Sequence, residues 1–390
     1  MKIAMLLTNA YGPDFRVQKE ALSLTQMGHS VTVFAWDRKG HSPKKEISSG
    51  IQVIRCRIRG SYGRGIRQAL QFVLFYAWAF NCLMAYKCDA VHCHDLDTLP
   101  IGLLVGKLKS ARIIYDSHEP SYFPSNSRGS KSRLSRVLAR VEACLSKYVN
   151  FVIATNPWHL EKFESMGIQQ ALIVANYPPA GIFGDIKTKA TNNSFVFGTV
   201  AAIRPMIGIE LMIDAFRLLR KDVKEISLVI AGYCEQDQYL QKLKQRARLT
   251  PGVVFDTVND LGKLQDRYER LDAVLLLYLP TERSHQLNTS TRLYESMAAK
   301  RAVIVSNVGW TAEVVKREVC GLILTEYSAD ALASSMLELY RNRAMARELG
   351  EKGYEAFRMR YYWELNLLSL KTVYSEANNE PLATAAVLPG

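Results

Sequence analysis

The sequence lacks the spacings that mark common nucleic-acid-binding modules. It contains no zinc-finger spacing, no RNP-like run and no basic region followed by heptads. Nucleic acid is therefore not an expected partner. No signal peptide is visible either, because the first apolar residues form a short predicted strand that ends at polar Thr8 and Asn9.

Cysteine provides no framework for the fold. The seven cysteines are odd in number, scattered and mostly within apolar segments, so reduced thiols are expected. Cys88, His92, Cys93 and His94 lie close together in the sequence, but neither CxxC nor HxxxH spacing is present. The run also alternates like the end of a strand. We therefore expect no metal there.

Length and charge set the outer limits. A chain of 390 residues with 48% hydrophobic content is long enough for two or more domains with buried cores. The net charge of +13 is unevenly spread, because residues 1–190 hold 25 Lys/Arg against 13 Asp/Glu, while the remainder hold 25 against 24. The first half should therefore attract an anionic partner, and a membrane surface or phosphorylated lipid is favoured.

Short apolar strands alternate with helical runs along the chain, which predicts βαβ units. A helix is predicted from about Asp14 to Met27, where Gly28 ends it. A linker rich in Gly, Lys, Thr and Asn is predicted after Ala180, up to Asn193. The predicted strands are Lys2–Thr8, Val31–Trp36, Ala90–Cys93, Ile113–Tyr115, Phe151–Thr155, Phe195–Val200, Leu228–Ala231, Val253–Phe255, Ala273–Leu276 and Ala302–Val305.

The run from Ala69 to Tyr86 is nearly continuous apolar sequence and reaches the lower length limit for a transmembrane helix. Gln71 and Asn81 interrupt it, and a predicted strand follows almost at once. A membrane span would split the βαβ series, so a helix packed on the sheet is the favoured interpretation.

Basic residues form two groups in the first half. One is a helical stripe expected to lie opposite a core stripe. The basic stripe is Arg133, Arg136 and Arg140, and the expected core stripe is Leu134, Val137, Val141 and Leu145. The second group lies beside the aromatic-rich segment Phe72–Phe80, and it comprises Arg55, Arg57, Arg59, Arg64 and Arg67.

A polar loop enters a predicted helix near residue 290. The loop and the first turn contain Asn288, Thr289, Ser290, Thr291 and Arg292. The free N–H groups and positive dipole end of such a helix attract a phosphate, and Glu295, one turn in, can accept hydrogen bonds from ribose hydroxyls. The pattern fits a nucleotide diphosphate site, and it also fits an ordinary capped helix.

The segment STRLYESMAAKRAVIVSNVG, from Ser290 onward, resembles the nucleotide-sugar segment of family-4 glycosyltransferases of the GT-B fold. Glu295 matches the second Glu of that family's Glu-x7-Glu motif, whereas the first is Leu287 here. Lys300 and Ala302 replace the family's usual Gly and Pro. The resemblance implies that residues 288–292, with Arg292 adding charge, hold the donor diphosphate and that Glu295 binds ribose.

The opening βαβ unit, LTNAYGPDFRVQKEA, also resembles this family. A loop at the carboxyl end of a first parallel strand faces the ligand crevice in open α/β sheets. The resemblance and this rule together place Asn9, Tyr11, Gly12 and Arg16 along the cleft, on the acceptor side.

Two further segments resemble the family. His118, in YDSHE, corresponds to a His that approaches the donor sugar and the attacking hydroxyl, which implies a catalytic role; a local capping role is the alternative. In AAIRPMIGIELMIDAF, Arg204 matches an Arg that holds the donor diphosphate, but Ile207 stands where the family has Lys. Gly232 and Tyr233 follow a predicted strand, where a base can lie against backbone that has no side chain.

Asp95 and Asp97 have the spacing by which a different glycosyltransferase fold, GT-A, holds manganese. The competing interpretation is a helix start, with Asp97 or Thr98 as the N-cap before Pro100. The βαβ organisation favours the helix start, so no bound metal is expected.

The predicted fold is α/β of the GT-B type, with two doubly wound, Rossmann-like domains facing a central cleft. Residues 1–180 form the acceptor-side domain and 194–361 the nucleotide-sugar domain. A helix at 362–376, beginning at Tyr362, is expected to cross back to the first domain, and the tail after Ala377 is expected to be disordered.

The resemblance implies a retaining, metal-independent glycosyltransferase with no cofactor, in which a nucleotide-diphosphate sugar is the co-substrate. The expected acceptor is a sugar- or lipid-linked hydroxyl, and the expected location is the cytoplasmic side of the plasma membrane, peripherally attached to an anionic surface. Two alternatives stay open. One is a nucleotide-sugar epimerase or hydrolase, and the other is a donor-binding scaffold without catalysis, suggested by Leu287 and Ile207.

Overall fold

The structure is a computed structural model that describes residues 1–12, 14–60, 66–118, 133–184, 186, 194–234, 236–257, 261–281 and 290–375. Side chains at 66–67, 133–135 and 261 are outside this description. The chain divides into two compact units. Unit 1 comprises Met1–Ala175 and Asn366–Gly390, and unit 2 comprises Asn176–Leu365.

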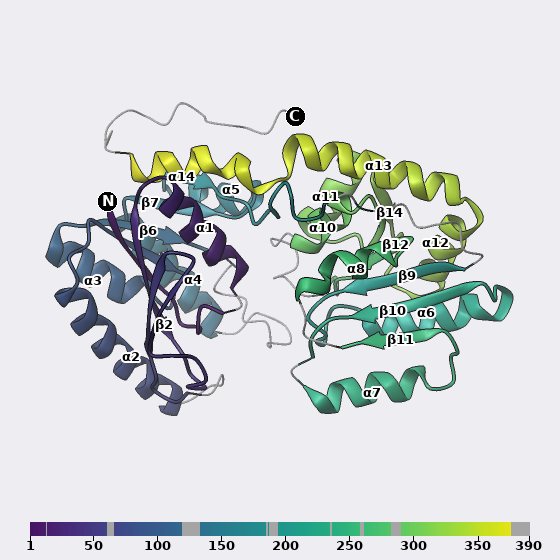
Figure 1. The fold of residues 1–390 in the computed structure, drawn as a ribbon, viewed down its shortest axis with the longest axis horizontal. Coiled ribbons are helices and arrows are strands. Elements are labelled where there is room, and N and C mark those ends of the chain that lie inside the picture. The colour runs from purple at the N-terminus through teal and green to yellow at the C-terminus, as the bar shows by residue number, and fades with distance from the viewer. Residues whose placement is uncertain are drawn as a thin grey trace. The chain divides into compact units, whose positions relative to one another are not determined.

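Unit 1 is built on an eight-stranded sheet in the order β3-β4-β2-β1-β5-β6-β7-β8 (Figure 1). All neighbouring strands are parallel except β3, which pairs antiparallel with β4 at the edge. The core order β4-β2-β1-β5-β6-β7 is that of a doubly wound sheet. The strands are β1 (Lys2–Leu6), β2 (Ser30–Trp36), β3 (Lys45–Ser48), β4 (Ile51–Cys56), β5 (Ala90–His94), β6 (Arg112–Asp116), β7 (Phe151–Ala154) and β8 (Ala171–Ile173).

Helices cover both faces of this sheet. Side chains alternate along a strand, so the two faces of the sheet carry different residues. On one face, Leu6, Phe34 and Trp36 pack in a core with α2 and α3. On the other face, α1 and α14 contact each other and lie over the polar residues of β5 and β6. The helices are α1 (Phe15–Gln26), α2 (Ile66–Ala85), α3 (Leu99–Lys109), α4 (Arg133–Leu145), the short η1 (Ser146–Tyr148), α5 (Pro157–Ser165) and α14 (Leu367–Tyr374).

Unit 2 contains a six-stranded, all-parallel sheet in the order β11-β10-β9-β12-β13-β14, which is the order of a Rossmann sheet. Its strands are β9 (Phe195–Val200), β10 (Ile226–Ala231), β11 (Val253–Asp256), β12 (Ala273–Leu276), β13 (Ala302–Val305) and β14 (Gly321–Ile323). Its helices are α6 (Ile209–Asp222), α7 (Asp237–Ala247), η2 (Leu261–Lys263), α8 (Leu264–Glu269), α10 (Thr291–Ala298), α11 (Gly309–Glu318), α12 (Ala329–Arg341), α13 (Arg343–Arg360) and η3 (Trp363–Asn366).

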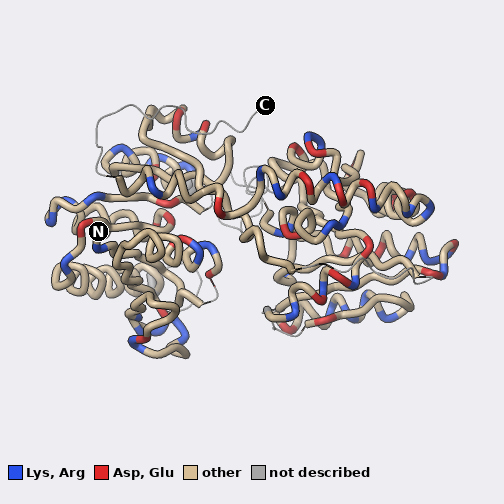
Figure 2. Tube along the Cα trace, turned by 45° about the horizontal axis from the view of Figure 1, so that its top comes forward, with Lys and Arg blue, Asp and Glu red and all other residues tan. Residues whose placement is uncertain are grey.

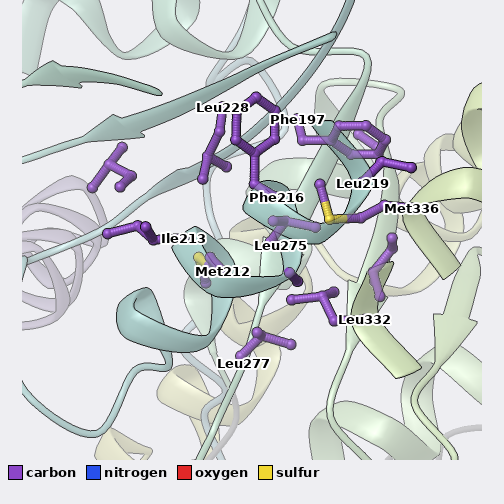
Figure 3. Close-up of a cluster of buried hydrophobic side chains, with 14 of the residues drawn as sticks. Phe197, Met212, Ile213, Phe216, Leu219, Leu228, Leu275, Leu277, Leu332 and Met336 are labelled. Atoms are coloured by element: carbon purple, nitrogen blue, oxygen red, sulfur yellow. The ribbon is translucent and has the colours of Figure 1, made fainter. Parts of the chain in front are cut away.

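The core of unit 2 fills the space between one sheet face and helices α6 and α12. Phe216 and Met212 of α6 lie among Phe197, Leu228 and Leu275 of the strands (Figure 3). All five side chains are almost completely buried. This packing fixes the sheet that carries the donor-side residues.

The predicted strands all form, and β9, β12 and β13 have the predicted bounds. The C-terminal helix is shorter than expected, since η3 ends at Asn366 and α14 belongs to unit 1. The division falls after Ala175, and Asn366 Nδ2 donates to the Ala175 carbonyl over 2.9 Å. Most of the expected linker and the tail after Ala377 lie outside the described residues.

The expected core stripe of α4 is wrong at Val137 and Val141 and correct at Leu145, while the side chain of Leu134 lies outside the described residues. Val137 and Val141 are exposed, whereas Glu142 is completely buried and Leu138 and Leu145 pack against the core. The Glu142 carboxylate accepts hydrogen bonds from Tyr115 (2.8 Å) and Lys162 (2.7 Å), which stabilise a charge inside unit 1. These contacts fix the rotation of α4 about its axis, so that Glu142 faces the interior and Val137 and Val141 face solvent.

Candidate functional site

The ligand edge of a doubly wound sheet lies at the carboxyl ends of its strands, where the strand order reverses. In unit 1 this point is between β1 and β5, and in unit 2 it is between β9 and β12. The predicted site residues that the structure describes divide between these two edges.

Asn9 organises the loop after β1. Its Oδ1 accepts from the Tyr11 backbone N–H (2.8 Å), and its Nδ2 donates to Asp14 (2.8 Å), the N-cap of α1. Tyr11 adopts a positive φ of 68° and is 4% exposed. Gly12 is exposed. Asn9 and Gly12 therefore remain the more accessible of the expected acceptor-side residues.

Arg16 lies in the interior rather than on an open surface. It is 4% exposed, and its guanidinium donates two hydrogen bonds to Asp116 at the end of β6. Nη1 donates to the carbonyl of Val174 over 2.8 Å, and Nη2 lies 3.1 Å from Glu20. An acceptor-side role for Arg16 therefore has to act through Asp116.

His118 is held between two carboxylates. Its Nε2 lies 2.7 Å from Asp116 Oδ2, its Nδ1 lies 3.4 Å from Asp95 Oδ2, and its backbone N–H donates to Asp95 Oδ1 over 3.1 Å. His94 Nδ1 also lies 3.0 Å from Asp116. The His118 side chain is 19% exposed while that of Asp116 is fully buried, so His118 presents this buried cluster to solvent.

The electrostatics favour a positively charged His118. Burial alone lowers the pKa of His118, but the carboxylates of Asp95 and Asp116 outweigh burial and raise it to about 10. Burial favours neutral Asp116, yet Arg16 and His118 hold the pKa of that carboxyl well below its usual value. At neutral pH the imidazolium can donate a hydrogen bond and stabilise negative charge, but it is not a ready general base.

A second layer of buried titratable groups lies behind this pair. His92 stacks on His94 with ring centroids 4.3 Å apart, and its Nδ1 lies 2.7 Å from the Tyr374 hydroxyl. Ligand atoms of Glu20, His92, His94 and Asp116 lie within 4.8 Å of one another. The cation that these carboxylates contact is the guanidinium of Arg16, whose permanent charge disfavours a metal ion in the same place.

Asp95 and Asp97 face different partners. Asp95 contacts His118, whereas Asp97 Oδ2 accepts from the hydroxyl of Thr8. Helix α3 begins after Thr98, its N-cap. The helix-start interpretation is therefore correct, and the two carboxylates do not converge as a manganese pair.

The ligand edge of unit 2 has a backbone surface at Gly232. A Cβ there would lie 1.8 Å from the Ala201 carbonyl oxygen, so only glycine fits this approach. Tyr233 follows, 47% exposed. Arg204 is exposed and makes no hydrogen bond or ion pair within the part of the chain that the structure describes. Ile207 is 2% exposed and belongs to the core, so it supplies no substitute for the family's Lys.

Helix α10 starts where the sequence predicted. Ser290 is its N-cap, without a side-chain capping bond, and Thr291 is its first residue. Arg292 Nη2 donates to the Tyr278 hydroxyl over 2.6 Å, which ties this cation to the end of β12. The predictions for Leu287, Asn288 and Thr289 fall outside the described residues.

Glu295 is partly buried, and its Oε2 accepts a hydrogen bond from the hydroxyl of Tyr268 over 2.9 Å. Burial first and Glu295 second raise the pKa of Tyr268 well above its usual value, so the phenol remains a donor. Tyr268 therefore orients the carboxylate that was predicted to bind ribose.

Sequence reasoning missed Asp116, Glu20 and Tyr374 as members of the unit 1 cluster. One signal was present. His94 and Asp116 are direct partners in the parallel β5–β6 register, and polar residues at i and i+2 share a face of the sheet.

Two doubly wound units, one with a glycine-backed edge and a helix start suited to a phosphate, define a two-domain nucleotide-binding α/β protein. Residues 12–179 match the protein family described as "Glycosyl transferase 4-like domain". Residues 185–356 match the family described as "Glycosyl transferases group 1". The chain belongs to the GT-B glycosyltransferases of this family-4-like group.

An uncharacterised glycosyltransferase of Methanocaldococcus jannaschii is 32% identical over 85 residues, which is 22% of this chain and 24% of that protein. The matched region spans about a quarter of that relative's length.

Solved structures show the same GT-B fold over nearly the whole chain. Sucrose-phosphate synthase from Thermosynechococcus elongatus has a TM-score of 0.78 at 19% identity, covering 96% of this chain and 98% of that one. HepE of Anabaena in complex with UDP-glucose has a TM-score of 0.70 at 15% identity, covering 95% and 98%. WaaG, a glycosyltransferase involved in lipopolysaccharide biosynthesis, has a TM-score of 0.68 at 15% identity, covering 96% and 100%.

Proposed function

We propose that this protein transfers a sugar from a nucleotide-diphosphate donor to a hydroxyl of a membrane-borne or lipid-linked glycan acceptor. The observation that carries the proposal is the ligand edge of unit 2, where exposed Arg204 and the backbone at Gly232 offer a cation and an unobstructed surface. HepE of the same fold is bound to UDP-glucose, which supports a nucleotide sugar as the donor.

The chemistry proposed is retaining and metal-independent. The acceptor hydroxyl attacks the anomeric carbon, the bond from that carbon to the β-phosphate oxygen breaks, and the hydroxyl proton passes to the departing phosphate. Arg204, Arg292 and the start of α10 hold the phosphate charge, and Glu295 binds ribose. His118 acts as a charged hydrogen-bond donor near the reacting sugar, positioned by Asp116.

The location proposed is the cytoplasmic face of the plasma membrane, reached by peripheral attachment of unit 1. The basic excess of the first half supports this, since each Lys or Arg near an anionic leaflet contributes about 1 kcal/mol. Arg55 is buried and paired with Glu46, so it does not contribute. The other described members of the two basic groups are exposed, namely Arg57, Arg59, Arg136 and Arg140, while Arg64 and the side chains of Arg67 and Arg133 lie outside the described residues.

The test is calorimetric titration with a panel of nucleotide sugars, beginning with UDP-glucose, followed by a turnover assay with and without glycan acceptors. A transferase consumes donor only when acceptor is present. Release of free sugar or of an isomer without acceptor would indicate a hydrolase or epimerase. Donor binding without any turnover would indicate a scaffold, for which the buried Ile207 in place of a cation is the supporting observation.

A further inference from the structure

Helix α2 presents an uncharged face to solvent. Phe75, Ala79 and Leu83 are fully buried against the core. In the window Gln68–Ala85, however, only 17% of residues are buried although the mean hydropathy is 1.3, and the window contains no Lys, Arg, Asp or Glu. Among the described helices, α2 is long and apolar enough to cross a membrane, judged by length and composition alone. The exposed positions recur at helical spacing and are Ala69, Leu70, Val73, Leu74, Ala77, Asn81, Met84 and Ala85.

The neighbouring helix α3 adds to this face. It packs beside α2 (Figure 1), with Leu104 and Leu108 51% and 58% exposed. Lys109 Nζ donates to the carbonyls of Leu83 and Met84, which places a cation at the C-terminal end of α2. A helix that is apolar on both its buried and its exposed sides is typical of a surface that binds a partner or a membrane.

A basic pocket lies at the other end of α2. It is a shallow, open cavity of about 420 Å³ at the carboxyl ends of β2 and β4. None of its lining residues that the structure describes is Asp or Glu. The lining residues are Arg38, Lys39, His41, Arg59, Gly60 and Gln71. The pocket therefore suits an anion.

The pocket is built by specific contacts rather than by chance proximity. Arg38 is 6% exposed, its Cζ lies 3.8 Å from the centroid of the Trp36 ring, and its Nε donates to the Thr8 carbonyl. The Asp37 carboxylate accepts from the backbone N–H groups of Gly40 and Ser42, both over 2.8 Å. These bonds fix the loop that carries Lys39 and His41.

The pocket and the α2 face are continuous. Gln71 lines the pocket, and Leu70, Val73 and Leu74 are exposed on the same turns of helix. In unit 2, by contrast, basic and acidic segments alternate along the helices (Figure 2). An anion site directly beside an apolar stripe is the chemistry of a lipid headgroup and its acyl chains.

We propose that the pocket binds the phosphate of an anionic phospholipid headgroup while the exposed face of α2 enters the bilayer interface. The inference rests on the proposed function, because it names the surface by which unit 1 reaches a membrane-borne acceptor. Arg38, Lys39 and Arg59 neutralise the phosphate. Leu70, Val73 and Leu74 lie in the acyl boundary. The side-chain oxygen of Gln71, buried and without a hydrogen-bond partner among the described residues, can accept from a headgroup hydroxyl.

The test is sedimentation of the full chain with vesicles of phosphatidylglycerol and phosphatidylcholine, and with phosphatidylcholine alone. The Lys39→Ala/Arg59→Ala variant should bind the anionic vesicles about 25-fold more weakly, about fivefold for each charge removed. Arg136→Ala/Arg140→Ala is the matched control, since both residues are exposed on α4 and the same charge is lost. Equal losses of vesicle binding in both variants would show that only the overall positive charge matters, and would overturn the proposal that the pocket binds the phosphate.

A second arm tests the apolar face. Val73→Ser/Leu74→Ser should weaken binding at least about tenfold, because the contact of both side chains with the acyl boundary is lost. Leu249→Ser, 88% exposed in unit 2, should leave binding unchanged. A wild-type dimer in sedimentation equilibrium that the Val73/Leu74 variant abolishes, without vesicle binding, would assign the face to a second copy instead. Equal binding to vesicles charged with a carboxylate lipid would overturn the phosphate assignment.

Calorimetry with UDP-glucose separates this inference from the proposed function. None of the substituted pocket or α2 residues lies in unit 2, so nucleotide affinity should be the same in every variant. A wild-type protein that binds donor and ignores vesicles contradicts the docking surface alone. Vesicle binding without donor binding supports the docking surface and contradicts the proposed transferase.

Discussion

Arg16 and Asp116, 100 residues apart in the sequence, form a bidentate pair inside unit 1, with Nε to Oδ2 at 3.0 Å and Nη2 to Oδ1 at 2.6 Å. The pair joins α1 to the end of β6, next to the predicted catalytic His118. Since Asp116 Oδ2 also contacts His118 Nε2, the charge of Arg16 influences the imidazole through a shared carboxylate.

Asp116→Asn should lower the free energy of unfolding by about 3–5 kcal/mol, because it removes the carboxylate that pairs bidentately with the buried guanidinium of Arg16 and leaves Glu20 as the remaining carboxylate beside it. Chemical denaturation measures this. Asp222→Asn, at an exposed position of α6, is the control. Adding Arg16→Met to Asp116→Asn should recover part of the loss, and strictly additive effects in the double-mutant cycle would argue against coupling.

His118 gives a pH dependence with a definite sign. Its folded pKa of about 10 lies above the ordinary value, so its contribution to stability is complete below about pH 6.5 and is lost as the pH rises towards 10. We expect the unfolding free energy to fall over that window and His118→Gln to flatten the fall. The check is denaturation at half-unit steps from pH 6 to 10. An unchanged slope in the variant would assign the titration to another group.

In catalysis, His118→Ala should lower turnover far more than donor affinity, because a group at the reacting centre contributes mainly to the transition state. Wild-type turnover should persist to alkaline pH and decline only as the imidazolium loses its proton. Initial rates and donor titration on the same preparations measure the two effects. Equal losses in rate and affinity would make His118 a binding or structural residue.

The donor side can be tested at Glu295. Glu295→Ala should weaken affinity for the nucleotide diphosphate by about 1.5–3 kcal/mol, the range for a hydrogen bond to a charged group. Tyr268→Phe should weaken it less, since it removes only the bond that orients the carboxylate. Glu313→Ala, exposed on α11, is the control. Unchanged affinity in Glu295→Ala would remove this residue from the site.

Most of the strands that the sequence predicts are buried on both faces, although the predicted Val253–Phe255 belongs to the partly exposed edge strand β11. Ala273–Leu276 and Ala302–Val305 are continuous apolar runs, which identify central parallel strands, and both are fully buried. Strands β3, β4, β8 and β14 were not predicted. β3, β8 and β14 are short edge strands with partial exposure, and β4, which lies between β3 and β2, has exposed and half-buried positions that break its apolar run. A continuous apolar run therefore identifies a strand even at an edge, as in β11, whereas strands without such a run, including the internal β4, are not distinguished from loops.

The candidate site residues could be predicted only in part, because their roles depend on tertiary contacts. His118 was proposed from resemblance, and Glu295 from the helix start and from resemblance, but the partners that set their protonation and orientation were not predicted. Asp116 obtains its role from Arg16, and Glu295 is oriented by Tyr268, contacts that no local pattern contains. Helix α4 shows the same limit, because the buried charge of Glu142 is stabilised only by its tertiary partners.

Gly232 should tolerate no side chain. A Cβ would lie 1.8 Å from the Ala201 carbonyl oxygen, which is backbone and has no rotamer to move, and the φ of 133° disfavours other residues. Gly232→Ala should lower stability by more than about 1 kcal/mol and weaken donor binding. Gly181→Ala, with no atom within 4 Å of the added Cβ, is the control. A Gly232→Ala protein with wild-type melting and affinity would show that the loops after β9 and β10 move freely.

Lys300 occupies a position where the resembling family has glycine, and it adopts a left-handed φ of 57° at the end of α10. That conformation costs a side-chain-bearing residue about 1 kcal/mol relative to glycine. Lys300 Nζ also lies 3.1 Å from Glu351 Oε2 and 4.5 Å from the centroid of the Tyr354 ring, and these partly exposed contacts together contribute about 0.5 kcal/mol. Lys300→Gly should therefore raise the melting temperature of unit 2, with a net gain of about 0.5 kcal/mol or more in the free energy of unfolding.

The control is Lys316→Gly, within α11. It should instead lower the free energy of unfolding by about 1 kcal/mol, because glycine is unfavourable inside a helix. Calorimetric melting compares the two variants, and a loss of stability in Lys300→Gly would show that the contacts with Glu351 and Tyr354 outweigh the backbone conformation.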